Sequence, residues 1–500
     1  MIKMMKERIR NLLSSDGSLQ QKTIKSGFWS FGSRLSTRGL DLIKLVIVAR
    51  LLSPDDFGLL GMAILAMAVF QVFTETGFKD AIIQNKNDVN GYLNTAWTTL
   101  ILRGIILYTI VFFSAPYVAL FFGEPRAELI IQVLGLTIVL NGLQNIAVVL
   151  LRKELQFQKQ FVLNLGGALP SFILTVSLAY ILKNVWALVY GSLIGAAGII
   201  FISYLVHPYK PRLEFHILKA KEMFIFGKWI LAASIVIFIA TNGDNIFVGR
   251  YLGAFSLGLY ALAFSISNIT TTEITHVIGA VAFPAYTKIQ EDQLKLKKAL
   301  SRTIRTVLTI SIPITIAIIL FIPEFTKYIL GEQWIAIIWP VRILAIAGFL
   351  RSVSAAWGAF YLSKGKPKYD FYKNLVKVIG IFSTIYFLTQ YYGIMGTALA
   401  VLIGQLFDLI LGNFLLNKLI PYKYNIRQSL DYLKGILLSL TVSSVVYLVA
   451  IQYIISFYSF LLISSVIIII FVLMILLTEK INFNPAIKEM RGNLSILNKE

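Results

Sequence analysis

The stretch KSGFWSFGSRLSTRGLDLIKLVIVARLLSPDDFGLLGMA, residues 25–63, decides the fold because the chain contains it twice. Residues 225–263 read IFGKWILAASIVIFIATNGDNIFVGRYLGAFSLGLYALA. A Trp, an Arg, two Gly and several apolar residues keep their register in the two copies. The matched pairs are Gly27/Gly227, Trp29/Trp229, Val48/Val248, Arg50/Arg250, Leu52/Leu252, Gly58/Gly258, Leu59/Leu259 and Ala63/Ala263. Self-similarity at a fixed spacing is the signature of an internal repeat, so we predict two homologous halves.

The composition around this repeat is that of a membrane protein. Of the 500 residues, 57% are hydrophobic and only 14% are charged, which is more apolar surface than a soluble core hides. The net charge of +21 fits cytoplasmic loops rich in Lys and Arg, so we expect no nucleic-acid partner. The chain has no Cys and 3 His. We therefore expect no disulfide, no thiol chemistry and no metal site.

Apolar segments recur along the whole chain. We count about fourteen that are long enough to cross a bilayer. Because the repeat restarts after an even number of spans, the halves are parallel repeats that suit two rocking lobes. We predict an all-α polytopic fold of two pseudo-symmetric six-helix lobes and a C-terminal helix pair. Its parts are a basic amphipathic N-terminus (1–24), an N-lobe (25–206), a linker (207–221), a C-lobe (222–420), the helix pair (431–478) and a tail (479–500).

The distribution of basic residues predicts the orientation. With a cytoplasmic N-terminus, about 33 basic residues fall in cytoplasmic segments and about five outside, as the positive-inside rule requires. One of the predicted cytoplasmic loops contains Lys364, Lys366, Lys368 and Lys373. Both termini are therefore predicted to be cytoplasmic.

Ionisable residues inside the predicted spans indicate a polar cavity, because each costs on the order of 3 kcal/mol at a helix centre. Arg34, Arg38 and Asp41 lie within one narrow arc of the first span, with Lys44 at its edge. The candidates for binding a substrate in this cavity are Arg34, Arg38, Lys44, Arg103, Arg342, Asn141 and Asn145. The candidates for ion coupling or gating are Asp41, Glu75, Asp244, Glu273 and Asp408.

Alternative interpretations of these residues stay open. Lys44 and Asp244, which are equivalent in the repeat, could form an ion pair between the lobes. Asn141 and Asn145 could hydrogen-bond between helices, and Lys377 could extend its ammonium to the membrane surface. The basic residues outnumber the acidic ones, and a positive cavity favours an anionic cargo.

No sequence motif for catalysis is present. The chain lacks Walker, GxSxG, HExxH and Gly-rich dinucleotide sequences, so we predict a protein that is not an enzyme and has no cofactor, with coupling to H+ or Na+ left open. Two other functions remain as alternatives. One is a cation or drug antiporter, which needs an acidic and aromatic cavity; the other is a membrane glycosyltransferase or polymerase, against which the short external loops argue.

Three stretches resemble a known family. VARLLSPDDFGLLGMA at residues 48–63, TGFKDAIIQ at 76–84 and LLRKELQFQKQF at 150–161 look like the polysaccharide transporter branch of the multidrug/oligosaccharidyl-lipid/polysaccharide (MOP) superfamily. This branch includes Wzx-type flippases and the colanic and teichuronic acid exporters, and is similar to MATE transporters and the lipid II flippase.

The resemblance implies both a fold and a cargo. The implied fold has fourteen helices in two lobes with an alternating-access cavity. The implied cargo is an undecaprenyl-diphosphate-linked oligosaccharide, which moves across the bacterial plasma (inner) membrane. Membrane lipid and polysaccharide polymerase or assembly proteins are the other partners that it implies.

Overall fold

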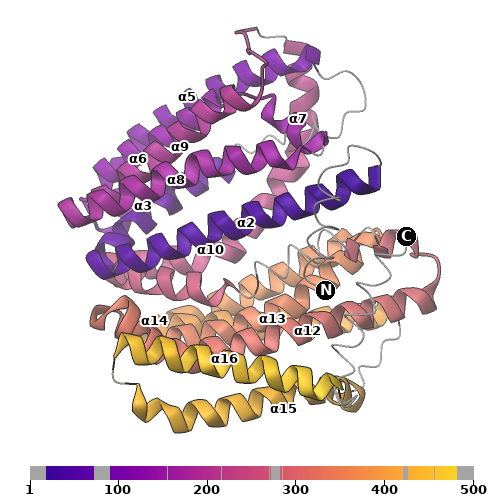
Figure 1. Cartoon of the computed structure of the whole chain (residues 1–500). Coiled ribbons are helices and arrows are strands. Elements are labelled where there is room, and N and C mark those ends of the chain that lie inside the picture. The colour runs from indigo at the N-terminus through magenta and orange to yellow at the C-terminus, as the bar shows by residue number, and fades with distance from the viewer. Residues whose placement is uncertain are drawn as a thin grey trace. The chain divides into compact units, whose positions relative to one another are not determined.

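The computed structural model describes residues 19–72, 90–154, 156–214, 217–269, 271, 282–283, 285–420, 426–454 and 456–480. These residues form helices joined by short turns, with no strand among them, so the predicted all-α fold is confirmed (Figure 1). Residues 1–18 and 481–500 lie outside the described residues, and they include most of the predicted N-terminal segment and tail.

The chain divides into two compact units. Unit 1 comprises residues 1–238 and 249–258, and unit 2 comprises residues 239–248 and 259–500. These units are defined by contacts within the structure. The lobes predicted from the sequence, residues 25–206 and 222–420, are defined by the internal repeat and stay a prediction.

The helices of unit 1 are α2 (Leu19–Leu51), α3 (Pro54–Val72), α5 (Asn90–Phe122), α6 (Ala127–Leu143), α7 (Val148–Lys153), α8 (Phe157–Leu182) and α9 (Trp186–Val206), together with most of the first part of α10 (Ile217–Ser267). Helix α5 lies beside α6, and α8 lies beside both α9 and α2. At the contact between α2 and α8, the rings of Trp29 and Phe161 are 5.5 Å apart, and Asn164 Nδ2 donates to Ser33 Oγ at 3.0 Å.

Unit 2 contains the rest of α10 and the elements α12 (Gln293–Glu324), η1 (Phe325–Leu330), η2 (Glu332–Ile337), α13 (Ile338–Ser363), α14 (Pro367–Leu419), α15 (Ile426–Ala450), η3 (Ile451–Tyr453) and α16 (Phe457–Lys480). Its core includes Phe360, Tyr361 and Leu416. The Tyr447 hydroxyl of α15 hydrogen-bonds the buried Glu324 carboxylate and, at 2.8 Å, the Leu320 carbonyl of α12. These contacts attach the α15–α16 hairpin to the unit.

The turns of the two halves are built alike. Gly123 between α5 and α6 has a φ of 70°, and Gly331 between α12 and α13 has a φ of 111°. Lys183 between α8 and α9 has a φ of 51°, and Gly393 inside α14 has a φ of 56°. At Gly393, and at Gly253 in α10, two helices continue into each other across a kink. Two corresponding turns, Gly123/Gly331 and Lys183/Gly393, therefore have a residue with positive φ in both halves, which agrees with the predicted duplication.

Two repeat-equivalent glycines cross at backbone distance in unit 1. A Cβ on Gly58 of α3 would overlap the carbonyl oxygen of Ala254, and a Cβ on Gly258 would overlap the carbonyl oxygen of Pro54. Pro54 and Ala254 are themselves equivalent in the repeat, so the two contacts are related by a local twofold axis. Only glycine permits this approach of two backbones.

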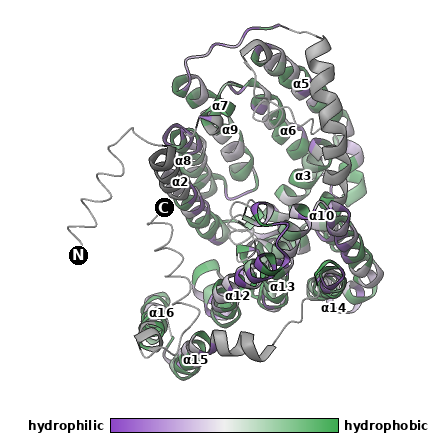
Figure 2. Cartoon of the chain, turned by 90° about the vertical axis from the view of Figure 1, so that its right-hand side faces the viewer, coloured by the Kyte–Doolittle hydropathy of each residue, from purple (hydrophilic) through white to green (hydrophobic). Residues whose placement is uncertain are grey.

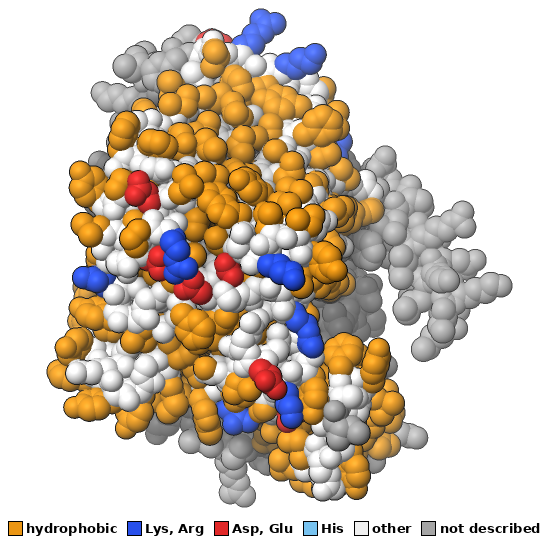
Figure 3. Space-filling view, turned by 90° about the vertical axis from the view of Figure 1, so that its left-hand side faces the viewer, with side chains coloured by type: hydrophobic (Ala, Val, Ile, Leu, Met, Phe, Trp, Pro, Cys, Tyr) orange, Lys and Arg blue, Asp and Glu red, His pale blue; other side chains and the backbone are white. Residues whose placement is uncertain are grey.

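The helix surfaces are those of a membrane-spanning protein. Ten helices among the described residues are long and apolar enough to cross a bilayer, and most helices in Figure 2 are hydrophobic along much of their length. Side chains such as Leu120, which is 77% exposed, face outward, and hydrophobic residues dominate the face drawn in Figure 3. The exposed apolar surface requires lipid. The predicted multi-pass membrane protein is confirmed, whereas the total of about fourteen spans stays a prediction.

Candidate functional site

Unit 2 encloses a cluster of charged side chains. Asp408 of α14 is 4% exposed and accepts hydrogen bonds from Ser354 Oγ at 2.5 Å and from Gln405 Nε2 at 2.9 Å. Lys373 is 2% exposed; its Nζ lies 3.8 Å from Asp408 Oδ1 and donates to the Ser354 carbonyl at 3.3 Å. Buried charges persist where they are paired and hydrogen-bonded, and this pair meets that condition.

Asp244 and Arg351 belong to the same cluster. The Asp244 carboxylate, on α10, accepts a hydrogen bond from the Tyr260 hydroxyl at 2.7 Å. Arg351 of α13 donates from its NH1 to Asn268 Oδ1 at 2.9 Å. Coulombic attraction links Arg351 to Asp244 and to Asp408. Two of the five predicted ion-coupling candidates, Asp244 and Asp408, therefore share one electrostatic environment.

Lys377 is the third basic residue of the cluster. Its side chain is buried, at 7% exposed, and it interacts electrostatically with Arg351, Lys373, Asp244 and Asp408. No residue in the part of the chain that the structure describes forms a hydrogen bond or an ion pair with its ammonium group.

The fold of α14 brings these residues together. The chain reverses at Gly393, so the arm that carries Lys377 packs against the arm that carries Asp408. A Cβ on Gly404 would lie 2.8 Å from the Lys377 carbonyl oxygen, and a Cβ on Gly380 would lie 3.1 Å from Gly404 Cα. The two arms approach this closely because both contact positions are glycine.

Lys373 lies within a helix, so its predicted place in a cytoplasmic loop is wrong. Helix α14 begins at Pro367, and Lys373 lies nearly two turns inside it. Its spacing of four residues from Lys377 places both ammonium groups on one helix face. This four-residue spacing is the feature of the sequence from which the pairing of Lys373 with Lys377 could have been predicted. Ser354 and Tyr260, which bind the two carboxylates, carry no signal in the sequence alone.

The polar residues predicted on the first span lie on α2 in unit 1. Arg38 and Asp41 are exposed, while Arg34 and Lys44 are half-buried. Lys44 Nζ lies 3.2 Å from Asp41 Oδ1. The structure thus gives Lys44 a partner on its own helix, and Asp244 a partner in Tyr260.

A pocket of about 140 Å³ lies in unit 1. Its polar lining is Gln71 from α3, Arg103 from α5 and Asn141 from α6, and its apolar lining includes Leu107 and Ile138. Two of the predicted substrate-binding residues, Arg103 and Asn141, therefore line one pocket. A guanidinium group beside two amides supplies several hydrogen-bond donors for an anion.

Asn145 and Arg342 are engaged by backbone groups. Asn145 is fully buried; its Nδ2 donates to the Tyr209 carbonyl at 2.7 Å, and its Oδ1 accepts from the Ala147 amide at 3.1 Å. Arg342 is half-buried near the start of α13, where its Nε donates to the Ile319 carbonyl at 3.1 Å. Glu75 and Glu273 lie outside the described residues. Within the described ranges, no three His, Asp or Glu side chains converge as metal ligands would.

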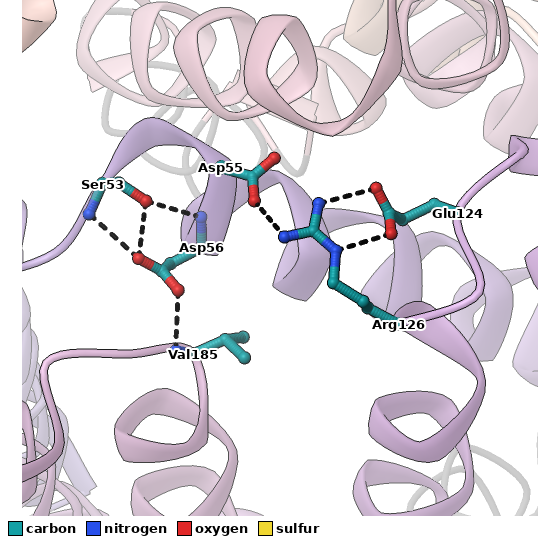
Figure 4. Close-up of polar contacts among 6 residues, drawn as sticks. All are labelled: Ser53, Asp55, Asp56, Glu124, Arg126 and Val185. Carbon is teal, nitrogen blue, oxygen red and sulfur yellow. Dashed lines mark hydrogen bonds and ion pairs between the residues drawn. The ribbon is translucent and has the colours of Figure 1, made fainter.

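A polar network fastens three turns at one end of unit 1 (Figure 4). Arg126 forms two hydrogen bonds with Glu124, at 2.7 and 2.8 Å, and one with Asp55 at 2.7 Å. Asp56 accepts from the Ser53 amide and hydroxyl, and its other oxygen accepts from the Val185 amide at 2.9 Å. The hydrogen bonds from Arg126 lower the pKa of the Glu124 carboxyl, and Glu124 and Asp55 raise the pKa of Arg126.

Together, the duplicated helical halves, the lipid-facing surface and the charges buried within unit 2 define a polytopic membrane protein with a transporter fold. The chain belongs to the family described as "Polysaccharide biosynthesis protein", whose model matches residues 47–339. The predicted resemblance to the polysaccharide transporters is thereby confirmed.

Individual comparisons agree with this assignment. The lipopolysaccharide biosynthesis protein WzxC of Escherichia coli K12 is 28% identical over 405 residues, which are 80% of this chain and 82% of that protein. The lipid II flippase MurJ, in an inward closed conformation, matches with a TM-score of 0.70 at 16% identity, over 92% of this chain and 99% of that one. An inward-facing MATE multidrug transporter of the MOP superfamily gives a TM-score of 0.62 at 18% identity, over 77% and 94% of the two chains. The MATE-like fold is confirmed.

Proposed function

We propose that the protein is a flippase that moves an undecaprenyl-diphosphate-linked oligosaccharide, the repeat unit of a polysaccharide, from the inner to the outer leaflet of the bacterial plasma membrane. Membership of a polysaccharide biosynthesis family and a fold similar to that of a lipid II flippase support this proposal. The mechanism is alternating access. The diphosphate and sugars travel through a polar cavity while the lipid tail stays in the bilayer.

The main structural support for this proposal is the length and the exposed charges of helix α2. It has 33 residues and is therefore about 50 Å long, which is enough to cross a membrane. It is nevertheless not among the ten helices that are apolar enough to do so. Arg38 and Asp41 are exposed on it, and exposed charges at bilayer depth require a polar surrounding rather than acyl chains. A spanning helix with a charged face fits the wall of a hydrophilic pathway.

Arg34 and Arg38 are the proposed ligands of the diphosphate. They lie one helical turn apart on α2, and guanidinium groups bind phosphate oxygens in a bidentate manner. Further contacts to the head group are assigned to Lys44, Arg103, Arg342 and Asn141. Asn145, also a candidate from the sequence, is fully buried and bound to backbone groups, so its proposed role is to position the chain around the pathway. Arg103 and Asn141 have the best-supported assignment because they line the pocket of unit 1.

Transport without chemistry is part of the proposal. Flipping breaks no covalent bond, and neither a catalytic residue nor a cofactor is assigned. A H+ or Na+ gradient supplies the free energy, with Asp41, Glu75, Asp244, Glu273 and Asp408 as the acidic candidates. Both termini are proposed to lie in the cytoplasm, and the enzymes that polymerise the exported unit are the proposed partners at the outer face.

The test is the double variant Arg34→Ala/Arg38→Ala in proteoliposomes that contain undecaprenyl diphosphate with a fluorescent oligosaccharide. A hydrogen bond to a charged group contributes about 1.5–3 kcal/mol, so the loss of two should slow flipping by about 100-fold or more. The matched control is Lys183→Ala, which removes an exposed charge in a turn.

The outcome distinguishes the alternatives. Flipping at the wild-type rate in the double variant would overturn the assignment. Resistance to cationic drugs in a host without its own pumps would favour the antiporter, and polymer formed by the purified protein from lipid-linked donors would favour a polymerase.

A further inference from the structure

The buried cluster of unit 2 has an excess of positive charge. Arg351, Lys373 and Lys377 are cations, whereas Asp244 and Asp408 are the buried carboxylates. Asp370 reaches Lys373 at 3.6 Å, but its side chain is 40% exposed at the edge of the cluster. Burial of an uncompensated charge is costly at membrane depth. Counted over the described residues, the buried part of the cluster becomes neutral when one of its three cations gives up a proton.

The contacts single out Lys377 as that cation. Arginine stays protonated in proteins, and Arg351 is hydrogen-bonded to Asn268. Lys373 is held by Asp408 and by the Ser354 carbonyl. Lys377 has neither kind of partner in the described part of the chain. Loss of a proton from Lys377 therefore breaks no hydrogen bond or ion pair with the described residues.

An unused acceptor lies on the facing arm of α14. Gln405 is buried, and its Oε1 has no hydrogen-bond donor among the described residues. Gly404, the residue before it, packs directly on the Lys377 backbone. The Gln405 carbonyl oxygen and the Lys377 side chain thus belong to the same cluster, on the two facing arms of α14.

We propose that Lys377 is the proton-binding site that couples flipping to the proton gradient, so that the coupling ion is H+ and not Na+. This inference rests on the proposed function. In the coupling step, Lys377 Nζ takes one proton from water to form an ammonium group and later returns it to water; no other bond changes. The groups that face it are Asp244 and Tyr260 of α10, Arg351 of α13, and Lys373 and Asp408 of α14, with Asp370 and Tyr361 near Lys373.

The same cluster is unsuited to a sodium ion. Hard cations need several oxygen ligands, but Asp408 Oδ2 already accepts hydrogen bonds from Ser354 and Gln405, and Asp244 Oδ2 accepts one from Tyr260. The other oxygen of Asp408 lies 3.8 Å from the Lys373 ammonium. Three neighbouring cations would also repel a metal ion. A proton on Lys377 needs none of these oxygens.

The first experiment measures proton binding by the purified full-length protein in detergent. Potentiometric titration compares the wild type with Lys377→Met and with the control Lys368→Met, which removes an exposed lysine of the same helix. We expect Lys377→Met to lose one bound proton per chain near neutral pH and Lys368→Met to lose none there. Identical curves for the two variants would overturn the proposal. Gel filtration verifies that each variant is folded.

The second experiment measures flipping in proteoliposomes that hold a pH-sensitive dye and undecaprenyl diphosphate with a fluorescent oligosaccharide. A pH gradient should accelerate flipping by the wild type, and a sodium gradient should not. Lys377→Met and Lys377→Arg should both lose the response to pH; the Arg variant keeps the positive charge and serves if the Met variant does not fold.

Failure of the proposed proton site and failure of the proposed flippase function give different results. Flipping that sodium drives, or that responds to pH in both Lys377 variants, overturns the proton site and leaves the flippase standing. No flipping by the wild type under any gradient, with the titration difference present, counts against the flippase and supports the proton site.

Discussion

Asp408 shows at the residue scale how a membrane interior holds charges. Its carboxylate accepts two hydrogen bonds and lies beside the Lys373 ammonium. The cost of burial is offset only while every member of the pair is present, because an ion left without its partner remains in a medium of low polarity.

We predict that Asp408→Asn destabilises the protein by about 3–5 kcal/mol, the usual cost of breaking a buried pair from one side. Thermal unfolding of the purified protein in detergent measures the change. The double variant Asp408→Asn/Lys373→Met should recover part of the loss, because it removes the stranded charge. Equal stability of Asp408→Asn and the wild type would show that the pair contributes nothing.

Glu124 predicts a pH dependence outside the membrane. Arg126 holds the pKa of Glu124 below its ordinary value of 4.5, chiefly through their hydrogen bonds. A carboxyl group whose pKa is lower in the folded state stabilises the protein above its unfolded pKa, and this stabilisation is lost as the pH falls through the folded value. As the pH is lowered from neutral to about 3, the unfolding temperature should therefore fall less steeply for Glu124→Gln than for the wild type. Parallel curves for the two proteins would contradict this assignment.

At the scale of elements, the contact between α3 and α10 depends on two glycines. Gly258→Ala would place a methyl group against the Pro54 carbonyl, and overpacking of this kind costs about 1–3 kcal/mol. Gly39 of α2 is the matched control, since nothing lies within 4 Å of the position of its Cβ. Gly39→Ala should stabilise the helix by up to about 1 kcal/mol. Unfolding temperatures that do not separate the two variants would refute the contact.

Elements were predictable from the sequence where a local rule decided them. Apolar length predicts the spanning helices, and the paired glycines and their register predict the duplication. The kink at Gly393 and the packing at Gly404 follow from tertiary approach, which no local pattern specifies. For the same reason the sequence identified Asp244 and Asp408 as candidates but not that α14 brings Lys373 and Lys377 to them.

The whole molecule offers a direct test of orientation. Because the chain has no cysteine, single cysteines report their own accessibility. In intact cells, a membrane-impermeant maleimide should label Lys183→Cys and Lys327→Cys, in the predicted outer turns, but not Lys210→Cys or Lys366→Cys. All four should react after the membrane is permeabilised. The opposite labelling pattern would reverse the proposed topology.

The crossing of Gly58 and Gly258 has a consequence for the history of the gene. Each glycine is held small by the main chain of the other copy, not by a replaceable side chain. Most other positions of the two copies have since drifted apart, but here a change in one copy is blocked by the other. The two copies of the repeat therefore still constrain each other at this point, and a side chain at either glycine would meet the main chain of the other copy.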